Sequence, residues 1–278
     1  MESLVSTEWL AGEIGKPDLR ILDASWFLPD SGRDGRTEYL SAHIPGASFV
    51  DLESLSDPDG ELPHMLPPAA PFAARMRSLG IGDHDRIVIY DNSPLHTAAR
   101  VWWMLRLFGA RQVAILDGGF ALWLAEGRPV ESGTRETRPG HFTPDRSEDE
   151  VADMAHVLAL GEDTMLVDAR PAARFRGDNP EPRPGLAAGH IPGSKSLPQS
   201  ELFEPDGRWK RGEALRAAFA EAGVDLSKPM VTTCGSGVTA AVLLFGAHLL
   251  GKDDVRLYDG SWTEWGSDPA TPKATGPE

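Results

Sequence analysis

The single cysteine of this 278-residue chain, Cys234, stands in the stretch VTTCGSGVTAAVLLFGAHLLG over residues 231–251. It follows a β-branched run that predicts a strand, and it precedes a Gly-Ser-Gly stretch and an apolar run that predicts a helix. A turn from a strand into a helix carries backbone N–H groups without a partner inside the helix, and these groups stabilise an anion. The pKa of a thiol placed there falls from about 8.5 to between about 3.5 and 7.5. The sequence therefore predicts that Cys234 is a nucleophilic thiolate at neutral pH.

The alternative for Cys234 is a buried structural role, because free cysteine is among the most buried residue types. The glycines of the turn favour the chemical role, since a glycine-rich turn costs conformational entropy and allows the backbone to approach a ligand closely. A Cys-x5-Arg phosphatase loop is excluded, because Ala240 stands where the arginine that clamps a phosphoryl group would be. Sulfur transfer remains, in which a cysteine becomes a persulfide and passes the sulfur atom to a second thiol.

The strands and helices expected around this turn belong to a sequence pattern that occurs twice in the chain. Four blocks recur in the same order, at offsets between 142 and 147 residues. They pair RILDASW (20–26) with MLVDARP (165–171), AHIPGAS (42–48) with GHIPGSK (189–195), RIVIYDNS (86–93) with PMVTTCGS (229–236), and ILDGGFALW (115–123) with LYDGSWTEW (257–265). In this pairing Asp91 occupies the position of Cys234. We therefore expect the first copy to be catalytically silent and to line one side of the active-site cleft.

Each copy alternates short apolar runs, several of them closed by Asp, with longer runs that end in Gly. The first kind is typical of buried parallel strands and the second of helices. The alternation predicts an α/β fold with two tandem domains, each a mostly parallel sheet flanked by helices. We place domain 1 at 1–130, a Pro-, Gly- and charge-rich linker at 131–150, and domain 2 at 151–278.

Composition limits the possible partners. The net charge of −15 argues against nucleic acid or an anionic membrane as a main partner, because both require a positive surface. The longest nearly apolar run, AAVLLFGAHLL, is far shorter than the roughly 20 residues of a membrane span. The histidines show no HExxH or HxH spacing, and one cysteine cannot form a CxxC site, so no metal site is expected. Without a basic and then apolar segment at the start, the expected location is cytoplasmic.

The whole pattern resembles the two-domain sulfurtransferases of the rhodanese superfamily over nearly all of the chain. The loop C234-GSGVTA matches the form found in 3-mercaptopyruvate sulfurtransferases, whereas thiosulfate sulfurtransferases carry basic residues after the cysteine. Further blocks that resemble this subfamily are the two HIPG motifs, PHMLP (63–67), RVWWMLRLFG (100–109), EPRPG (181–185) and YDGSWTEWG (258–266). The resemblance implies two tandem rhodanese-like domains, with the catalytic cysteine in the second.

The substrate implied by this resemblance carries one carboxylate beside a ketone. The resemblance assigns Arg174 and Arg183 to that carboxylate, and guanidinium groups do bind carboxylates in a bidentate manner. Arg170 and Arg176 are equally well explained as ion-pairing residues. The Ser236 hydroxyl could bind the ketone oxygen or relay a proton, the alternative being a turn-forming serine. Backbone N–H groups from the loop are expected to complete the site, namely those of Gly235, Gly237 and Val238, while Thr239 either takes part or caps the helix.

Two residues of the first copy, His43 and Asp34, are weaker candidates that could assist the reaction, with Asp34 orienting His43. The repeated HIPG motif favours a structural turn instead, and for His190 we expect a structural role. The tryptophans are expected to pack in the core, with one or two of them possible pocket walls; they are Trp102, Trp103, Trp123, Trp262 and Trp265.

The predicted reaction is a double displacement in which Cys234 takes the sulfur of 3-mercaptopyruvate, releases pyruvate and passes the sulfur on. The acceptor would be reduced thioredoxin, a small thiol, or cyanide in an assay, with no metal or organic cofactor required. One alternative is a thiosulfate:cyanide sulfurtransferase. The other is a sulfide-carrier or anion-binding module that holds its ligand without turnover.

Overall fold

The computed structural model describes residues 1–147 and 149–277. These residues form two compact units. Unit 1 contains Met1–Pro58, Leu66–Ser147 and Phe203–Trp209. Unit 2 contains Asp59–Met65 and, within the described residues, the chain from 149 to 202 and from 210 to 277. Each unit therefore includes a seven-residue segment from the other half of the sequence.

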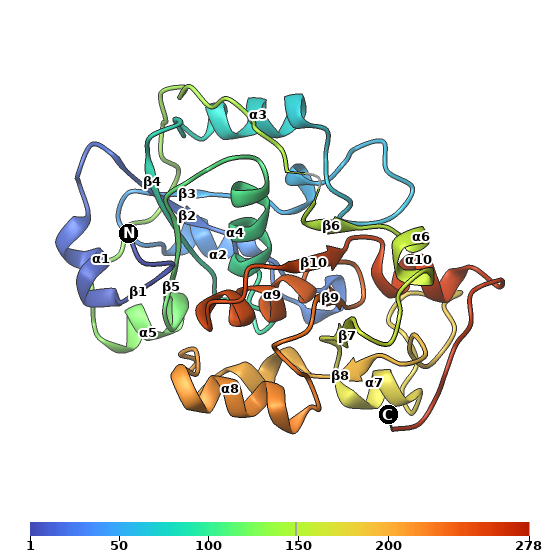
Figure 1. The fold of residues 1–278 in the computed structure, drawn as a ribbon. Helices are drawn as coiled ribbons and strands as arrows, with labels where there is room; N and C mark the ends of the chain where they lie inside the picture. Colours follow the sequence, from blue (N-terminus) through green and yellow to red (C-terminus); the bar gives the residue numbers. More distant parts are fainter. Residues whose placement is uncertain (148, 278) are drawn as a thin grey trace. The chain divides into compact units, whose positions relative to one another are not determined.

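Unit 1 is built on a five-stranded parallel sheet with the strand order β1-β5-β4-β2-β3. Its strands are β1 (Leu4–Val5), β2 (Leu19–Asp23), β3 (Ala47–Phe49), β4 (Arg86–Tyr90) and β5 (Val113–Leu116). Its helices are α1 (Thr7–Glu13), α2 (Gly35–Ser41), α3 (Ala69–Ser78), α4 (Ala98–Leu107) and α5 (Gly119–Ala125), with short 3₁₀ turns at Pro29–Ser31 and Glu53–Leu55 (Figure 1).

Unit 2 repeats this arrangement with the strand order β6-β10-β9-β7-β8, again all parallel. Its strands are β6 (Val151–Ala152), β7 (Met165–Asp168), β8 (Lys195–Ser196), β9 (Met230–Thr233) and β10 (Val255–Tyr258). Its helices are α6 (Met154–Leu158), α7 (Ala172–Arg176), α8 (Gly212–Glu221), α9 (Ala240–Leu249) and α10 (Ser261–Ser267), with a 3₁₀ turn at Gln199–Leu202. The two strand orders correspond one to one, which confirms the predicted fold class of two tandem α/β domains.

The helix that follows the fourth strand of each unit is the one that matters for the site. In unit 1 this is α4, which packs on β4 and β5, and in unit 2 it is α9, which packs on β9 and β10. Both helices are buried along most of their length. Gly109 and Gly251, which follow them, have φ values of 97° and 82°, a left-handed conformation that ends a helix and that glycine adopts at little cost.

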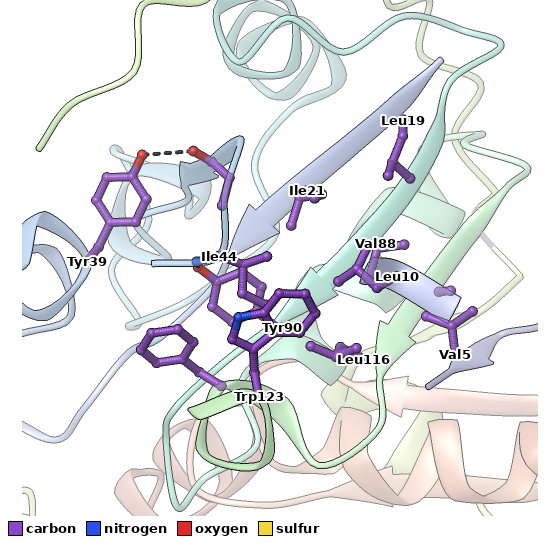
Figure 2. Close-up of a cluster of buried hydrophobic side chains, with 13 residues drawn as sticks. Val5, Leu10, Leu19, Ile21, Tyr39, Ile44, Val88, Tyr90, Leu116 and Trp123 are labelled. Atoms are coloured by element: carbon purple, nitrogen blue, oxygen red, sulfur yellow. Dashed lines mark hydrogen bonds between the residues drawn. The ribbon is translucent and has the colours of Figure 1, made fainter. Parts of the chain in front are cut away.

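Apolar side chains of the sheet and its helices form the core of each unit. In unit 1 Val88 and Tyr90 of β4 pack with Trp123 of α5, and the Tyr39 hydroxyl donates to the Ala47 carbonyl oxygen at 2.8 Å (Figure 2). In unit 2 Trp262 and Trp265 of α10 are packed in the corresponding core. All five tryptophans expected in the core are at most 2% exposed. Burying each of these large side chains contributes a few kcal/mol to stability.

Candidate active site

Cys234 follows β9 directly, and the loop 234–239 leads from it into α9. Cys234 is 2% exposed, and its thiol is not in a disulfide. Within the described chain, no protein acceptor takes the backbone N–H groups of four loop residues: Gly235, Ser236, Val238 and Thr239. A thiolate or a bound anion can accept hydrogen bonds from such groups. The loop therefore offers N–H donors to an anion, and the nucleophilic role of Cys234 stays a prediction.

Ser261, the first residue of α10, forms hydrogen bonds with the cysteine loop. Its Oγ atom accepts hydrogen bonds from the N–H of Cys234 at 3.2 Å and from the N–H of Gly237 at 3.0 Å. Its hydroxyl donates to the Tyr258 carbonyl oxygen at 2.8 Å. Gly237 thus differs from the expectation that its N–H serves the substrate, because Ser261 already accepts from it. Ser261 has a φ of 50°, a left-handed conformation that costs a non-glycine residue about 1–3 kcal/mol.

Two further backbone hydrogen bonds tie the loop to α10. The N–H of Trp262 donates to the Cys234 carbonyl oxygen, and the N–H of Thr263 donates to the Gly235 carbonyl oxygen, both at 2.9 Å. The Thr263 hydroxyl adds a second bond to the same Gly235 oxygen at 2.6 Å. The start of α10 therefore binds carbonyl oxygens of the loop. It does not use the N–H groups of Gly235, Ser236, Val238 and Thr239. Thr239 makes no side-chain capping bond at the start of α9, so the capping alternative for its hydroxyl is not observed.

His64 is a site residue that the sequence analysis did not single out. Its Nδ1 atom lies 2.8 Å from the Oγ atom of Ser236, and the two residues are 3% and 8% exposed. His64 belongs to the segment Asp59–Met65, which is part of unit 2 although it comes from the first half of the sequence. It also has a φ of 62°, an uncommon conformation for a residue with a side chain. The PHMLP motif contains this histidine, but nothing in its spacing indicates a contact with Ser236.

Arg174 on α7 lies against the cysteine loop. A Cβ atom built on Gly235 would be 3.3 Å from the Nη2 atom of Arg174. Arg174 also pairs through Nη2 and Nε with Glu181, whose side chain is 1% exposed. The guanidinium is therefore held beside the loop by a buried carboxylate. Arg183, two residues after Glu181, is half-buried, and its role in the site stays a prediction.

Arg170 is 1% exposed, and its guanidinium group is bound by other residues of the protein. It pairs with Asp168 at 2.6 Å and with Glu181 at 2.8 Å, and it donates to the Gly189 carbonyl oxygen at 2.8 Å. Burial disfavours its charge, but the charges of Asp168 and Glu181 outweigh burial and raise the pKa of Arg170. Arg176 forms an ion pair with Asp178 near the surface. Both residues thus have the ion-pairing role that the sequence left as one of two alternatives.

His43 and Asp34 make contacts of a structural kind within unit 1. The His43 Nδ1 atom lies 2.8 Å from the Tyr39 carbonyl oxygen, and its ring stacks on the Tyr39 ring with centroids 4.1 Å apart. His190 repeats this arrangement with Phe175, at 2.8 Å and 3.7 Å. Asp34 is exposed and caps α2 by accepting from the N–H of Thr37 at 2.7 Å. His43 and His190 thus make the same kind of contact in the two HIPG motifs, and an assisting role for His43 and Asp34 stays a prediction.

Residues 1–147 and 149–277 contain no group of three or more His, Cys, Asp or Glu side chains placed to hold a metal ion. No helix in the same described ranges is long and apolar enough to cross a membrane.

The fold and the cysteine loop place the chain in a known family. The rhodanese-like domain model matches residues 6–126 and 149–268. The chain therefore belongs to the rhodanese family and contains two copies of its domain.

Individual relatives narrow the comparison. The chain is 45% identical over 271 residues to the 3-mercaptopyruvate sulfurtransferase of Rattus norvegicus, covering 95% of this chain and 91% of the relative. It is also 45% identical over 273 residues to the thiosulfate sulfurtransferase of Bos taurus, with the same two coverages. The crystal structure of the 3-mercaptopyruvate sulfotransferase SseA from Escherichia coli matches at a TM-score of 0.86 and 41% identity, covering 94% of this chain and 99% of that one.

Proposed function

We propose that this chain is a 3-mercaptopyruvate sulfurtransferase that carries the transferred sulfur atom on Cys234. The relatives named for this activity support the proposed reaction. One structural observation supports Cys234 as the residue that carries the sulfur atom. The buried thiol stands at the turn from β9 into α9, where four backbone N–H groups have no acceptor in the described protein. Hydrogen bonds from such N–H groups can stabilise the anionic form of a nucleophilic sulfur atom.

In the first half-reaction, the Cys234 thiolate attacks the sulfur atom of 3-mercaptopyruvate. A sulfur–sulfur bond forms and the carbon–sulfur bond breaks, so its electron pair passes into the enolate of pyruvate. The donor's thiol proton then transfers to the carbon that carried the sulfur and completes the methyl group of pyruvate. The Ser236 hydroxyl, which lies 2.8 Å from the Nδ1 atom of His64, is proposed to hydrogen-bond the enolate oxygen or to relay that proton. The product on the protein is a Cys234 persulfide.

In the second half-reaction, a thiol acceptor attacks the outer sulfur atom of the persulfide and regenerates the Cys234 thiolate. Reduced thioredoxin and small thiols are the proposed acceptors, with cyanide as an assay substitute. Because the chain has one cysteine, the acceptor must come from another molecule. This order of events makes the reaction a ping-pong double displacement.

Sequence identity does not choose between the two donors, because the chain is also 45% identical to a thiosulfate sulfurtransferase. The charges of the site do distinguish the two donors. Thiosulfate is a dianion, whereas the carboxylate of 3-mercaptopyruvate is a monoanion. The loop residues Gly235 and Ser236 carry no charge, and the positive charge of Arg174 is partly balanced by Glu181. Such a site favours a donor with a single negative charge over thiosulfate.

Steady-state assays with both donors test the proposal. We expect kcat/KM to be higher for 3-mercaptopyruvate than for thiosulfate, and we expect Cys234→Ser to abolish pyruvate release. A higher kcat/KM for thiosulfate would contradict the proposed donor. Pyruvate release that survives in Cys234→Ser would contradict the proposed nucleophile.

Two further parts of the proposal concern the chain outside the loop. Domain 1, placed at 1–130, is proposed to lack transfer activity of its own because Asp91 replaces the thiol, although its segment Asp59–Met65 supplies His64 to unit 2.

A cytoplasmic location stays a prediction, and cell fractionation would test it, since one relative of this chain is named a mitochondrial protein.

A further inference from the structure

Unit 1 contains a cavity at the position that corresponds to the cysteine loop of unit 2. It has a volume of about 320 Å³ and opens beside the loop between β4 and α4. Asp91, Ser93 and His96 of this loop line it, together with Gly118 and with Trp209 from the segment Phe203–Trp209. The cavity is large enough for a small organic molecule. Unit 1 therefore has a pocket beside the loop in which Asp91 occupies the position of Cys234.

The Asp91 carboxylate takes the place of an anion in this loop. Its Oδ1 atom accepts from the N–H of Ser93 at 3.0 Å, and its Oδ2 atom accepts from the N–H of Ala98, at the start of α4, at 2.7 Å. When Asp91 is ionised, an anionic sulfur donor would be repelled by its negative charge. An ionised carboxylate accepts about four hydrogen bonds, so Asp91 retains capacity for further donors.

Asp91 is 8% exposed, and in the part of the chain that the structure describes no Lys, Arg or His side chain pairs with it. Burial raises the pKa of Asp91 to about 7, even though its two backbone hydrogen bonds act in the opposite direction. A buried carboxylate without a cation is costly, because its desolvation is not offset by an opposite charge. A bound cation would supply the missing partner.

The other ionisable side chains that line the cavity, Arg33 and His96, do not neutralise Asp91. The Arg33 guanidinium forms two hydrogen bonds of 2.6 Å with Glu38, so its charge is already balanced. Burial lowers the pKa of His96 to about 4, so this ring is neutral at neutral pH. Its ring stacks on Phe203 with centroids 3.5 Å apart. Trp209 adds an aromatic surface, which also suits a cation.

We propose that the cavity of unit 1 binds a small molecule through a primary ammonium group that donates hydrogen bonds to the Asp91 carboxylate. This site would be separate from sulfur transfer, since it lies in the unit whose loop has no thiol. The ammonium group matches the two properties of the cavity, which are a buried unbalanced carboxylate and a small aromatic-walled volume.

The test uses the full-length chain carrying Cys234→Ser, so that no reaction occurs at the thiol, at pH 8, where Asp91 is ionised. Isothermal titration calorimetry compares three probes of similar size: propylammonium, propionate and 1-propanol. We expect propylammonium to bind in the millimolar range and the other two not to bind. We expect Asp91→Asn to weaken propylammonium binding by about tenfold or more, the usual effect of losing a charged hydrogen-bond partner.

Two more variants keep the test decisive. Asp30→Asn removes the same charge from an exposed position of unit 1 and should leave propylammonium binding unchanged. Ala121→Phe places a large side chain at an exposed residue that lines the cavity, and it should reduce binding while Asp91 remains. The proposal is overturned if propylammonium does not bind, if the uncharged or anionic probe binds equally well, or if Asp91→Asn and Ala121→Phe both bind like Asp30→Asn.

Discussion

The Nδ1 atom of His64 lies 2.8 Å from the Oγ atom of Ser236, although 172 residues separate the two residues in the chain. Ser236 in turn is two residues from Cys234, the lone thiol of the loop. The contact therefore joins a histidine from the first half of the sequence to the loop that carries the proposed nucleophile. It gives the first half a direct part in the site even though its own loop has no cysteine.

If His64 and Ser236 act as one unit, single and double variants should show the same defect. We expect His64→Asn and Ser236→Ala each to lower kcat for 3-mercaptopyruvate by about 100-fold, since general acid–base groups contribute about 10²–10⁴-fold. The double variant should be no slower than the worse single variant. His84→Asn, an exposed histidine of unit 1, serves as the control. Losses that multiply in the double variant would show that the two residues act independently.

The buried carboxylate of Glu181 should set the position of Arg174. Glu181→Gln keeps the side-chain volume but removes the charge that pairs with both Arg170 and Arg174. We expect KM for 3-mercaptopyruvate to rise about tenfold with a smaller change in kcat, because the lost interaction concerns substrate binding. Asp178→Asn, which removes an exposed partner of Arg176, should leave KM unchanged. Equal KM values for Glu181→Gln and Asp178→Asn would contradict the positioning role.

Ser261 should be needed for the shape of the cysteine loop. Ser261→Ala removes the acceptor of the Cys234 and Gly237 N–H groups, and leaving buried donors unpaired costs about 1–3 kcal/mol. We expect the free energy of unfolding by urea to fall by this amount and kcat/KM to fall with it. Ser267→Ala, at the exposed end of the same helix, should change stability by less than about 0.5 kcal/mol. The role is refuted if the two variants are equally stable and active.

Asp91 should make the stability of the protein depend on pH. Its pKa is about 7 in the folded protein against an ordinary value of 3.8, so the folded state holds this proton more tightly than the unfolded state does. The stabilising contribution is complete below about pH 4 and is lost as the pH rises to about 7. A difference of about three in pKa corresponds to at most about 4 kcal/mol.

Asp91→Asn cannot ionise, so it isolates this contribution. Relative to the unchanged protein, we expect the variant to gain stability between pH 5 and pH 8 in urea unfolding experiments. Using the difference between the two proteins cancels the titration of all other groups. A difference that is the same at both pH values would mean that the Asp91 carboxyl group titrates normally in the folded state.

The main features of the fold could be predicted because they are local or repeated. Alternating apolar runs predict strands and helices, and the duplicated blocks predict two equivalent sheets, which the structure confirms through matching strand orders. The position of Cys234 at the end of a strand and before a helix follows from the residues on either side of it. For Cys234 the residues that carry this prediction lie within a few positions of it in the sequence.

Long-range contacts could not be predicted in the same way. The exchange of Asp59–Met65 and Phe203–Trp209 between the units depends on where two loops pack, and no periodic pattern records it. His64 was missed for this reason. Ser261 and Glu181 were missed because a serine after a turn and a glutamate among arginines are common in surface loops, and only burial reveals their partners. Conversely, His43 and His190 share a motif because both stabilise the same structural turn.

The central claim is that the Cys234 thiol accepts a sulfur atom from 3-mercaptopyruvate and holds it as a persulfide. Intact mass spectrometry of the protein mixed with 3-mercaptopyruvate in the absence of any acceptor tests this claim most directly. The account predicts a mass increase of one sulfur atom that is absent in Cys234→Ser and is removed by a thiol or by cyanide. An unchanged mass while pyruvate is released, or the same increase in Cys234→Ser, would contradict it.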